Sequence, residues 1–168
     1  MYIDTKDKEI ELKGIVWEDM VNYKKICMTL MFPKCEGFKC GANLCQNSPL
    51  AAAPSERHNI DDILDIYKNN PITEAIVLQG LEPLDSPVDC YTVAAALKHW
   101  EINDDLVIYT GYNPHENEVD KIINSIASLV PGHLIIKWGR YIPNQERHFD
   151  PILGIYLVSD NQYGEIIK

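Results

Sequence analysis

Three cysteines stand close together in one short stretch of the chain, at Cys35, Cys40 and Cys45. They follow residues 26–32, an apolar run with strand character that stops at Pro33. Thiolates are good ligands for soft metals, and three of them in one polar, Gly-containing loop are costly to keep unless something soft binds them. The spacing therefore predicts a metal or redox site in a loop at the end of a buried strand.

Two kinds of metal site fit three neighbouring thiols. Structural zinc usually takes four ligands, commonly from paired Cys-x2-Cys motifs, whereas this loop reads Cys-x4-Cys-x4-Cys and would need His58 or another donor to complete it. A 4Fe-4S cluster held by only three thiolates keeps one iron open to an external ligand. We favour the cluster, because we expect Cys27 to be buried in the strand and Cys90 to lie within a helix.

The periodicity of the chain predicts alternating strands and helices. Residues 9–16 alternate as an edge strand or hairpin arm, and residues 48–55 read as irregular. Later strands are predicted at residues 75–78, 106–109, 134–137 and 152–158. Helices are predicted from the cap Asn59 to about residue 69, from Pro87 to about residue 100, and over residues 116–130. The apolar face of the second helix is expected to be Val88, Tyr91, Ala94, Ala95, Leu97 and Trp100.

Strand–helix alternation predicts an α/β fold with mostly parallel strands, in one domain spanning residues 1–168. A closed barrel of eight strands typically needs about 250 residues. We therefore expect a partial, open (β/α) barrel. The carboxyl ends of parallel strands meet at one edge, so the cysteine loop, residues 80–83, residues 109–112 and residues 138–140 should converge there.

Composition excludes several partners. The chain has 168 residues with 25 acidic and 15 basic side chains, a formal net charge of -10, which repels nucleic-acid phosphates. No apolar run approaches the roughly 20 residues needed to span a bilayer, and no secretory leader opens the chain, so we expect a cytoplasmic protein without a membrane partner. Five cysteines in that compartment argue against a disulfide framework.

Four motifs, in order along nearly the whole chain, resemble those of the radical S-adenosylmethionine enzymes. Within that superfamily the sequence is most similar to the small activating proteins of anaerobic ribonucleotide reductase. The family's Cys-x3-Cys-x2-Cys motif ends in an aromatic residue and Asn; here the spacing is 4 and 4, and the ending is Cys45-Gln46-Asn47. The other matches are Gly80-Leu81-Glu82-Pro83-Leu84, in which Leu81 replaces a second glycine, Tyr109-Thr110-Gly111-Tyr112, and Ser159-Asp160-Asn161-Gln162.

The resemblance implies a fold of the radical S-adenosylmethionine type and a set of ligands. Cys35, Cys40 and Cys45 would hold a 4Fe-4S cluster, whose fourth iron binds the amino and carboxylate groups of S-adenosylmethionine. The turn of Gly80, Glu82 and Pro83 would bind the methionine moiety, with Glu82 near its cationic amine. Thr110 would meet the ribose or adenine, and Arg140 could meet the carboxylate. Asn161 and Gln162 receive no role.

The resemblance also implies a reaction and its partners. Reductive cleavage of S-adenosylmethionine would give a 5'-deoxyadenosyl radical, which removes a hydrogen atom from a glycine of a glycyl radical enzyme such as anaerobic ribonucleotide reductase. Because the chain lacks cysteines for an auxiliary cluster, an external donor of flavodoxin or ferredoxin type would supply the electron. Two alternatives stay open: radical chemistry on a small molecule, as in deazapurine-forming enzymes, and a metal-binding module without turnover.

Overall fold

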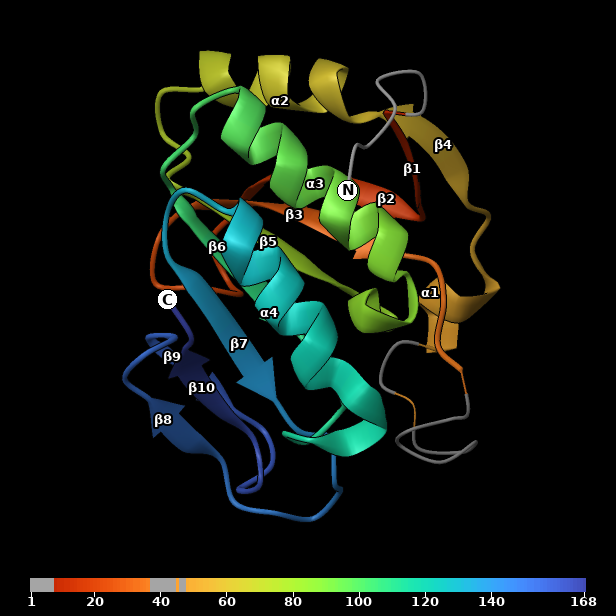
Figure 1. Cartoon of the computed structure of the whole chain (residues 1–168). Helices are drawn as coiled ribbons and strands as arrows, with labels where there is room; N and C mark the ends of the chain where they lie inside the picture. The colour runs from red at the N-terminus through yellow and green to blue at the C-terminus, as the bar shows by residue number, and fades with distance from the viewer. Residues whose placement is uncertain (1–7, 37–44, 46–47) are drawn as a thin grey trace.

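A twisted β-sheet with helices packed on it forms the centre of the molecule (Figure 1). The computed structural model describes residues 8–36, 45 and 48–168. Within these residues the main sheet has six strands, in the order β10-β7-β6-β5-β3-β2. Its strands are β2 (Gly14–Asp19), β3 (Cys27–Phe32), β5 (Ala75–Gly80), β6 (Asp105–Tyr109), β7 (Leu134–Trp138) and β10 (Tyr163–Ile166).

Two smaller sheets and four α-helices complete the described chain. β1 (Glu9–Leu12) pairs with β4 (Glu56–Asn59), and β8 (His148–Asp150) pairs with β9 (Ile155–Leu157). The helices are α1 (Ser48–Ala52), α2 (Ile60–Asn69), α3 (Pro87–His99) and α4 (Val119–Leu129), with short 3-10 turns at Pro83–Asp85 and Glu116–Glu118. None of the helices in this part of the chain is long and apolar enough to cross a bilayer.

The prediction of an α/β fold with mostly parallel strands is confirmed. β3, β5, β6 and β7 are mutually parallel, and β2 and β10 add antiparallel edges. The sheet is open rather than closed, because β10 and β2 stand at its two ends. All four parallel strands therefore deliver their carboxyl ends to one edge of the sheet.

Local capping chemistry sets where two of the helices begin. The side chain of Asn59 accepts hydrogen bonds from the backbone N–H groups of Asp61 (2.9 Å) and Asp62 (3.3 Å), and α2 starts at the next residue. Pro87 occupies the first position of α3, where the missing N–H of proline costs no helical hydrogen bond. Both starts agree with the sequence prediction.

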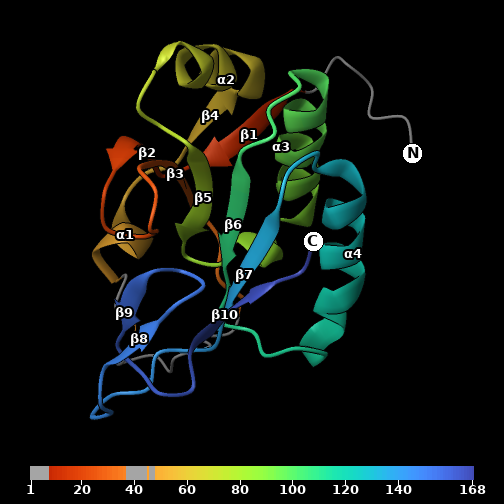
Figure 2. The ribbon, with the colours of Figure 1, turned by 90° about the vertical axis from the view of Figure 1, so that its left-hand side faces the viewer.

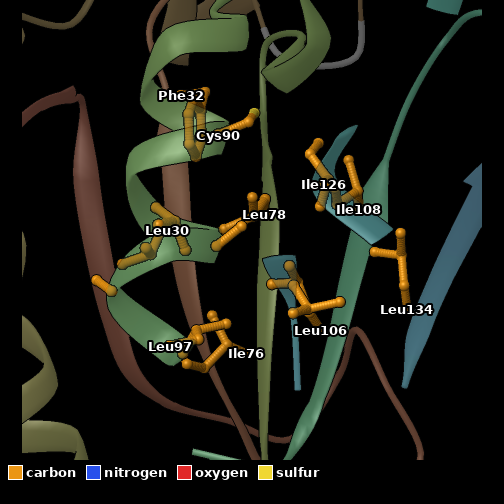
Figure 3. Close-up of a cluster of buried hydrophobic side chains, with 14 of the residues drawn as sticks. Leu30, Phe32, Ile76, Leu78, Cys90, Leu97, Leu106, Ile108, Ile126 and Leu134 are labelled. Atoms are coloured by element: carbon orange, nitrogen blue, oxygen red, sulfur yellow. The ribbon is translucent and has the colours of Figure 1, made fainter. Parts of the chain in front are cut away.

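Two apolar clusters lie on opposite faces of the sheet. The larger one joins alternate side chains of the parallel strands to α2, α3 and α4, with Leu30, Leu78, Leu97, Ile108 and Ile126 among its members (Figure 3). The smaller one contains no helical residue. Its members are Tyr23, Cys27, Ala75, Val77, Val107, Ile135, Leu153 and Leu157. Figure 2 shows α3 and α4 on one side of the sheet and the β8–β9 pair on the other.

The end of the chain differs from the prediction. The expected strand over residues 152–158 is only partly right: residues 151–154 form a turn, and only Ile155–Leu157 form a strand, β9, which pairs with β8 outside the main sheet. Asp150 holds this turn, because its carboxylate accepts the N–H groups of Leu153 and Gly164, both at 2.8 Å. The strand that joins the main sheet comes later, as β10.

Three further expectations need correction. Residues 9–16, expected as one edge strand or hairpin arm, form parts of two strands: β2 is an edge strand of the main sheet, whereas β1 pairs with β4 in a separate sheet. Residues 48–55, expected to be irregular, contain α1. Val88 is 70% exposed, because it lies about 200° around the helix from Cys90, and Cys90, Val93, Ala94 and Leu97 make the buried face of α3.

Candidate functional site

Hydrogen bonds join the loops that follow the parallel strands into one continuous edge. After β5, the N–H of Leu81 donates to the carbonyl of Phe32 (3.1 Å), and the N–H of Glu82 donates to the carbonyl of Lys34 (2.7 Å). Lys34 is the residue before Cys35. The turn after β5 is thus fixed directly to the start of the cysteine loop.

A second set of bonds extends this edge to β6 and β7. The carboxylate of Asp85 accepts the N–H of Glu36 (2.6 Å) and the hydroxyl of Tyr112 (2.5 Å). The carbonyl of Tyr112 in turn accepts the N–H of Gly139, just after β7, at 3.2 Å. The predicted convergence of four strand-end turns is therefore seen in the bonds that join residues 34–36, 81–85, 112 and 139.

The carboxyl group of Glu82 lies at the centre of this network. Its side chain is 1% exposed, and its two oxygens accept hydrogen bonds from the hydroxyl of Thr110 (2.9 Å) and from the N–H groups of Gly111 (2.7 Å) and Leu84 (3.2 Å). Burial raises the pKa of Glu82 to about 7, although these three hydrogen bonds act to lower it. In this structure the carboxylate ties the turn after β5 to the turn after β6.

Gly80 is required by close packing of two backbones. It has a φ of +104°, a conformation that L side chains rarely adopt, and a Cβ there would lie 2.7 Å from the N of Phe32 and 2.9 Å from its O. This contact brings the carboxyl ends of β3 and β5 together. Gly80 therefore allows the turn with Glu82 to sit against the start of the cysteine loop.

Pro83 and Thr110 are also buried in the same network. Pro83 starts the 3-10 turn, and its carbonyl accepts the Sγ–H of Cys90 at 3.1 Å. The Oγ of Thr110 accepts the N–H of Tyr112 at 3.0 Å while donating to Glu82. All four residues predicted to bind S-adenosylmethionine thus lie at this edge, as parts of the framework.

The cysteines fall into two physical classes. Cys27 and Cys90 are fully buried, and burial raises the pKa of Cys27 to about 12 and that of Cys90 well above its usual value. Cys35 is exposed and Cys45 is half-buried, whereas Cys40 lies outside the described residues. Metal-binding thiols must ionise, so the loop cysteines are the suitable donors. The expectations that Cys27 is buried in its strand and that Cys90 lies within a helix are confirmed.

A row of side chains at the same edge was missed by sequence reasoning. Met31 pairs with Gln79, and Tyr109 pairs with Lys137, across the parallel strands. Gln79, Tyr109 and Lys137 follow Val77, Val107 and Ile135 by two positions, and Met31 follows Cys27 by four, so they continue the sheet face that carries the smaller apolar cluster. The Nζ of Lys137 lies 5.4 Å from the centre of the Tyr109 ring. The sequence feature that could have predicted this row is Lys137, a charged residue within the otherwise apolar strand of residues 134–137.

The remaining predicted ligands are placed as follows. Arg140 lies after β7, where its guanidinium forms an ion pair with Glu116. His58 lies in β4, and its Nε2 is 4.0 Å from a carboxylate oxygen of Glu56. Within the described ranges, no three His, Cys, Asp or Glu side chains are grouped as a metal site, and the proposed trio includes Cys40, which is not described.

Comparison with known proteins adds no relative. None of the protein-family models, curated proteins or solved structures compared with this chain matches it.

Proposed function

We propose that this protein is a cytoplasmic radical S-adenosylmethionine enzyme that activates a glycyl radical enzyme, such as an anaerobic ribonucleotide reductase. Cys35, Cys40 and Cys45 would hold a 4Fe-4S cluster, and an external flavodoxin or ferredoxin would reduce it. When bound, the cluster and S-adenosylmethionine would supply one-electron cleavage of the sulfonium to a 5'-deoxyadenosyl radical. The chain's own residues bind, orient and shield these groups.

The order of the strands supports a partial barrel of the radical S-adenosylmethionine type. β2, β3, β5, β6 and β7 are neighbours in chain order, and α2, α3 and α4 all pack in the cluster on one face. A barrel has this arrangement, with helices only on its outer face. A doubly wound sheet instead reverses its strand order and carries helices on both faces.

The observation that carries the proposal is the hydrogen bond from the N–H of Glu82 to the carbonyl of Lys34. It places the turn implied to bind S-adenosylmethionine beside the residue that precedes Cys35. Lys34 and Glu82 are 48 positions apart in the sequence. The resemblance requires both motifs to meet one ligand, and the neighbouring parallel strands β3 and β5 bring their ends together, so this contact agrees with the proposal.

The donor set also fits a cluster with one open iron. The two cysteines outside the loop are buried, with raised pKa values, so they are poor donors for a fourth thiolate. Glu82 accepts three hydrogen bonds, and a carboxylate has about four lone-pair sites, which leaves capacity for the cationic amine of the methionine moiety. Gly80, Pro83 and Thr110 would shape the turn around that amine.

A small-molecule substrate is the second candidate for the same chemistry. The row of Gln79, Tyr109 and Lys137 favours it, because these polar side chains line the inner face of the sheet next to the strand ends. A ligand bound at the edge would meet this row at Gln79 and Tyr109, which are partly exposed, since Lys137 is buried. Formation of a glycyl radical in a partner protein, detected by electron paramagnetic resonance, would separate the two substrates.

Anaerobic reconstitution tests the proposal. We expect the wild-type protein to bind iron and sulfide, to show visible iron–sulfur absorption, and to form 5'-deoxyadenosine in a dithionite-dependent reaction. Cys35→Ala, Cys40→Ala and Cys45→Ala should each lose the cluster, whereas the matched controls Cys27→Ala and Cys90→Ala should keep it. Zinc without iron, or a cluster that survives loss of the loop cysteines, would refute the proposal and favour a metal-binding module without turnover.

A further inference from the structure

The tail segment Ser159-Asp160-Asn161-Gln162 is one of the four motifs of the resemblance, and the sequence assigns it no function. It connects β9 to β10, and β10 lies beside β7 in the sheet (Figure 1). The segment therefore runs next to residues 139–142, the loop that leaves the carboxyl end of β7. We call residues 139–142 the β7 loop.

Ser159 forms two hydrogen bonds with Ile142, at one end of the β7 loop. Its side chain is fully buried, and its Oγ accepts the N–H of Ile142 at 2.8 Å and donates to the carbonyl of Ile142 at 3.1 Å. One hydroxyl thus satisfies both backbone groups of a single residue. Such a reciprocal pair fixes the path of the loop more firmly than one hydrogen bond.

Asn161 and Gln162 hold the other end. The Nδ2 of Asn161 donates to the carbonyl of Arg140 at 2.9 Å, and the Nε2 of Gln162 donates to the carbonyl of Gly139 at 3.3 Å. Gly139 has a φ of +101°, and a Cβ there would lie 3.0 Å from the backbone oxygen of Asn161. The tail and the loop are therefore in backbone contact, and three side chains of the tail bond the loop's main chain.

The braced loop is part of the candidate site. The N–H of Gly139 bonds the carbonyl of Tyr112, whose hydroxyl reaches Asp85, and Asp85 accepts the N–H of Glu36. Two buried polar atoms at the loop, the Nε of Arg140 and the Oδ1 of Asn161, have no hydrogen-bond partner in the described chain. An N–H donor and an oxygen acceptor left without partners are costly unless a group from outside the framework meets them.

We propose that Ser159, Asn161 and Gln162 are positioning residues that hold the β7 loop as one wall of the S-adenosylmethionine site. This inference rests on the proposed function, because it assigns the wall to the ligand of that site. The tail residues raise the affinity for S-adenosylmethionine because they fix the position of the β7 loop. They do not contribute to cluster binding, which depends on the loop cysteines. The residues act on the loop's backbone and have no contact with reacting atoms.

Ligand affinity measured beside cluster content and stability tests this role. Asn161→Leu removes the bond to Arg140, and Ser159→Ala removes the pair to Ile142. Asp160→Asn is the matched control, because Asp160 is exposed and its side chain has no hydrogen bond among those found in the described chain. The probe is S-adenosylmethionine, in equilibrium dialysis with the reconstituted protein without oxygen. Iron content and melting temperature are recorded for each variant.

We expect both test variants to raise the dissociation constant for S-adenosylmethionine by about five- to tenfold, the size of one or two lost hydrogen bonds. Their iron content should match the wild type, their KM should rise more than their kcat falls, and Asp160→Asn should bind normally. A purely structural role would lower the melting temperature and leave the dissociation constant unchanged well below it.

Two results would overturn the inference alone: an unchanged dissociation constant in either folded variant, or loss of iron in parallel with loss of ligand. If Asn161→Leu does not fold, Ser159→Ala decides, because it deletes one oxygen atom and creates little space. A wild-type protein that holds the cluster and binds no S-adenosylmethionine would instead refute the proposed function.

Discussion

Glu82 shows how opposing forces act on a single carboxyl group. Burial removes it from water and favours the neutral form, whereas three donated hydrogen bonds favour the charged form. Burial dominates, and the pKa of Glu82 rises from 4.5 to about 7. The group is thus poised near neutral pH, where a bound cation would shift it strongly toward the carboxylate.

This pKa predicts a pH dependence of stability. The folded protein keeps the Glu82 proton up to about pH 7, whereas the unfolded chain releases it near pH 4.5. The contribution of Glu82 to the free energy of unfolding is therefore full below about pH 4.5 and is lost as the pH rises to about 7. From pH 5 to pH 8, the free energy of unfolding of the wild type should fall by roughly 1–3 kcal/mol relative to Glu82→Gln, which does not titrate. Urea unfolding of both proteins across this range measures the difference.

Other groups with shifted pKa values do not cancel this effect. Asp19, Asp61 and Asp105 have lowered pKa values, so their contributions change at lower pH than the Glu82 window. The difference between wild type and variant also removes every titration that both proteins share. Parallel stability curves for the two proteins would contradict the prediction.

For single residues, the sequence predicted which side chains lie at the candidate site better than it predicted what surrounds them in the fold. Cys27 was expected to be buried in its strand and Cys90 to lie within a helix, and both are so placed. Lys137 was missed, because its neighbours in sequence are apolar and only its strand register places it beside Tyr109. The three donors to Glu82 come from two turns that meet only in the folded chain, so no local pattern could reveal its buried state.

At the scale of elements, prediction succeeded where local chemistry decides and failed where tertiary contacts do. Asn59 and Pro87 mark helix starts by their own side chains, and both starts are correct. β10 has only four residues, of which only Gly164 is buried, so its sequence has no apolar pattern that predicts a strand. Its position depends on pairing with β7 and on the bond from Gly164 to Asp150, both of which are remote in sequence.

The junction between β3 and β5 allows a sharp test of an element-scale requirement. Gly80→Ala would place a Cβ 2.7 Å from the backbone N of Phe32, at a φ of +104°. We expect it to lower the free energy of unfolding by about 2–4 kcal/mol, because backbone atoms on the neighbouring strand cannot move aside cheaply. Chemical denaturation gives the value.

Gly14→Ala is the matched control for this substitution. Gly14 is also a strand glycine, but its nearest neighbour to an added Cβ is the side-chain sulfur of Met31 at 3.5 Å, an ordinary contact. Its effect should stay within about 1 kcal/mol. Equal effects of the two substitutions would show that the close approach of β5 to β3 is not the limiting contact.

For the whole molecule, the two faces of the sheet are covered in different ways. Helices cover one face with a large cluster, whereas Tyr23 and two leucines near the β8–β9 pair cover the other. Asp150 connects the second cover to the rest of the fold, because it binds both the turn at Leu153 and β10 at Gly164. Tyr109 packs against this second cluster, and its hydroxyl donates to the carbonyl of Asn22 at 2.5 Å, so the second cover reaches the strand ends beside the candidate site.

If this small cover is part of the cooperative fold, its central side chain should matter as much as a residue of the larger cluster. Leu153 is fully buried, and its carbonyl accepts the N–H of Lys24 at 2.8 Å. Leu153→Ala should lower the free energy of unfolding by about 2–4 kcal/mol in a single transition. Phe149→Ala, in the same hairpin but 53% exposed, should cost about 1 kcal/mol or less, mainly through its edge contact with Tyr156. A separate early transition for Leu153→Ala in urea would show instead that the second cover opens independently of the main sheet.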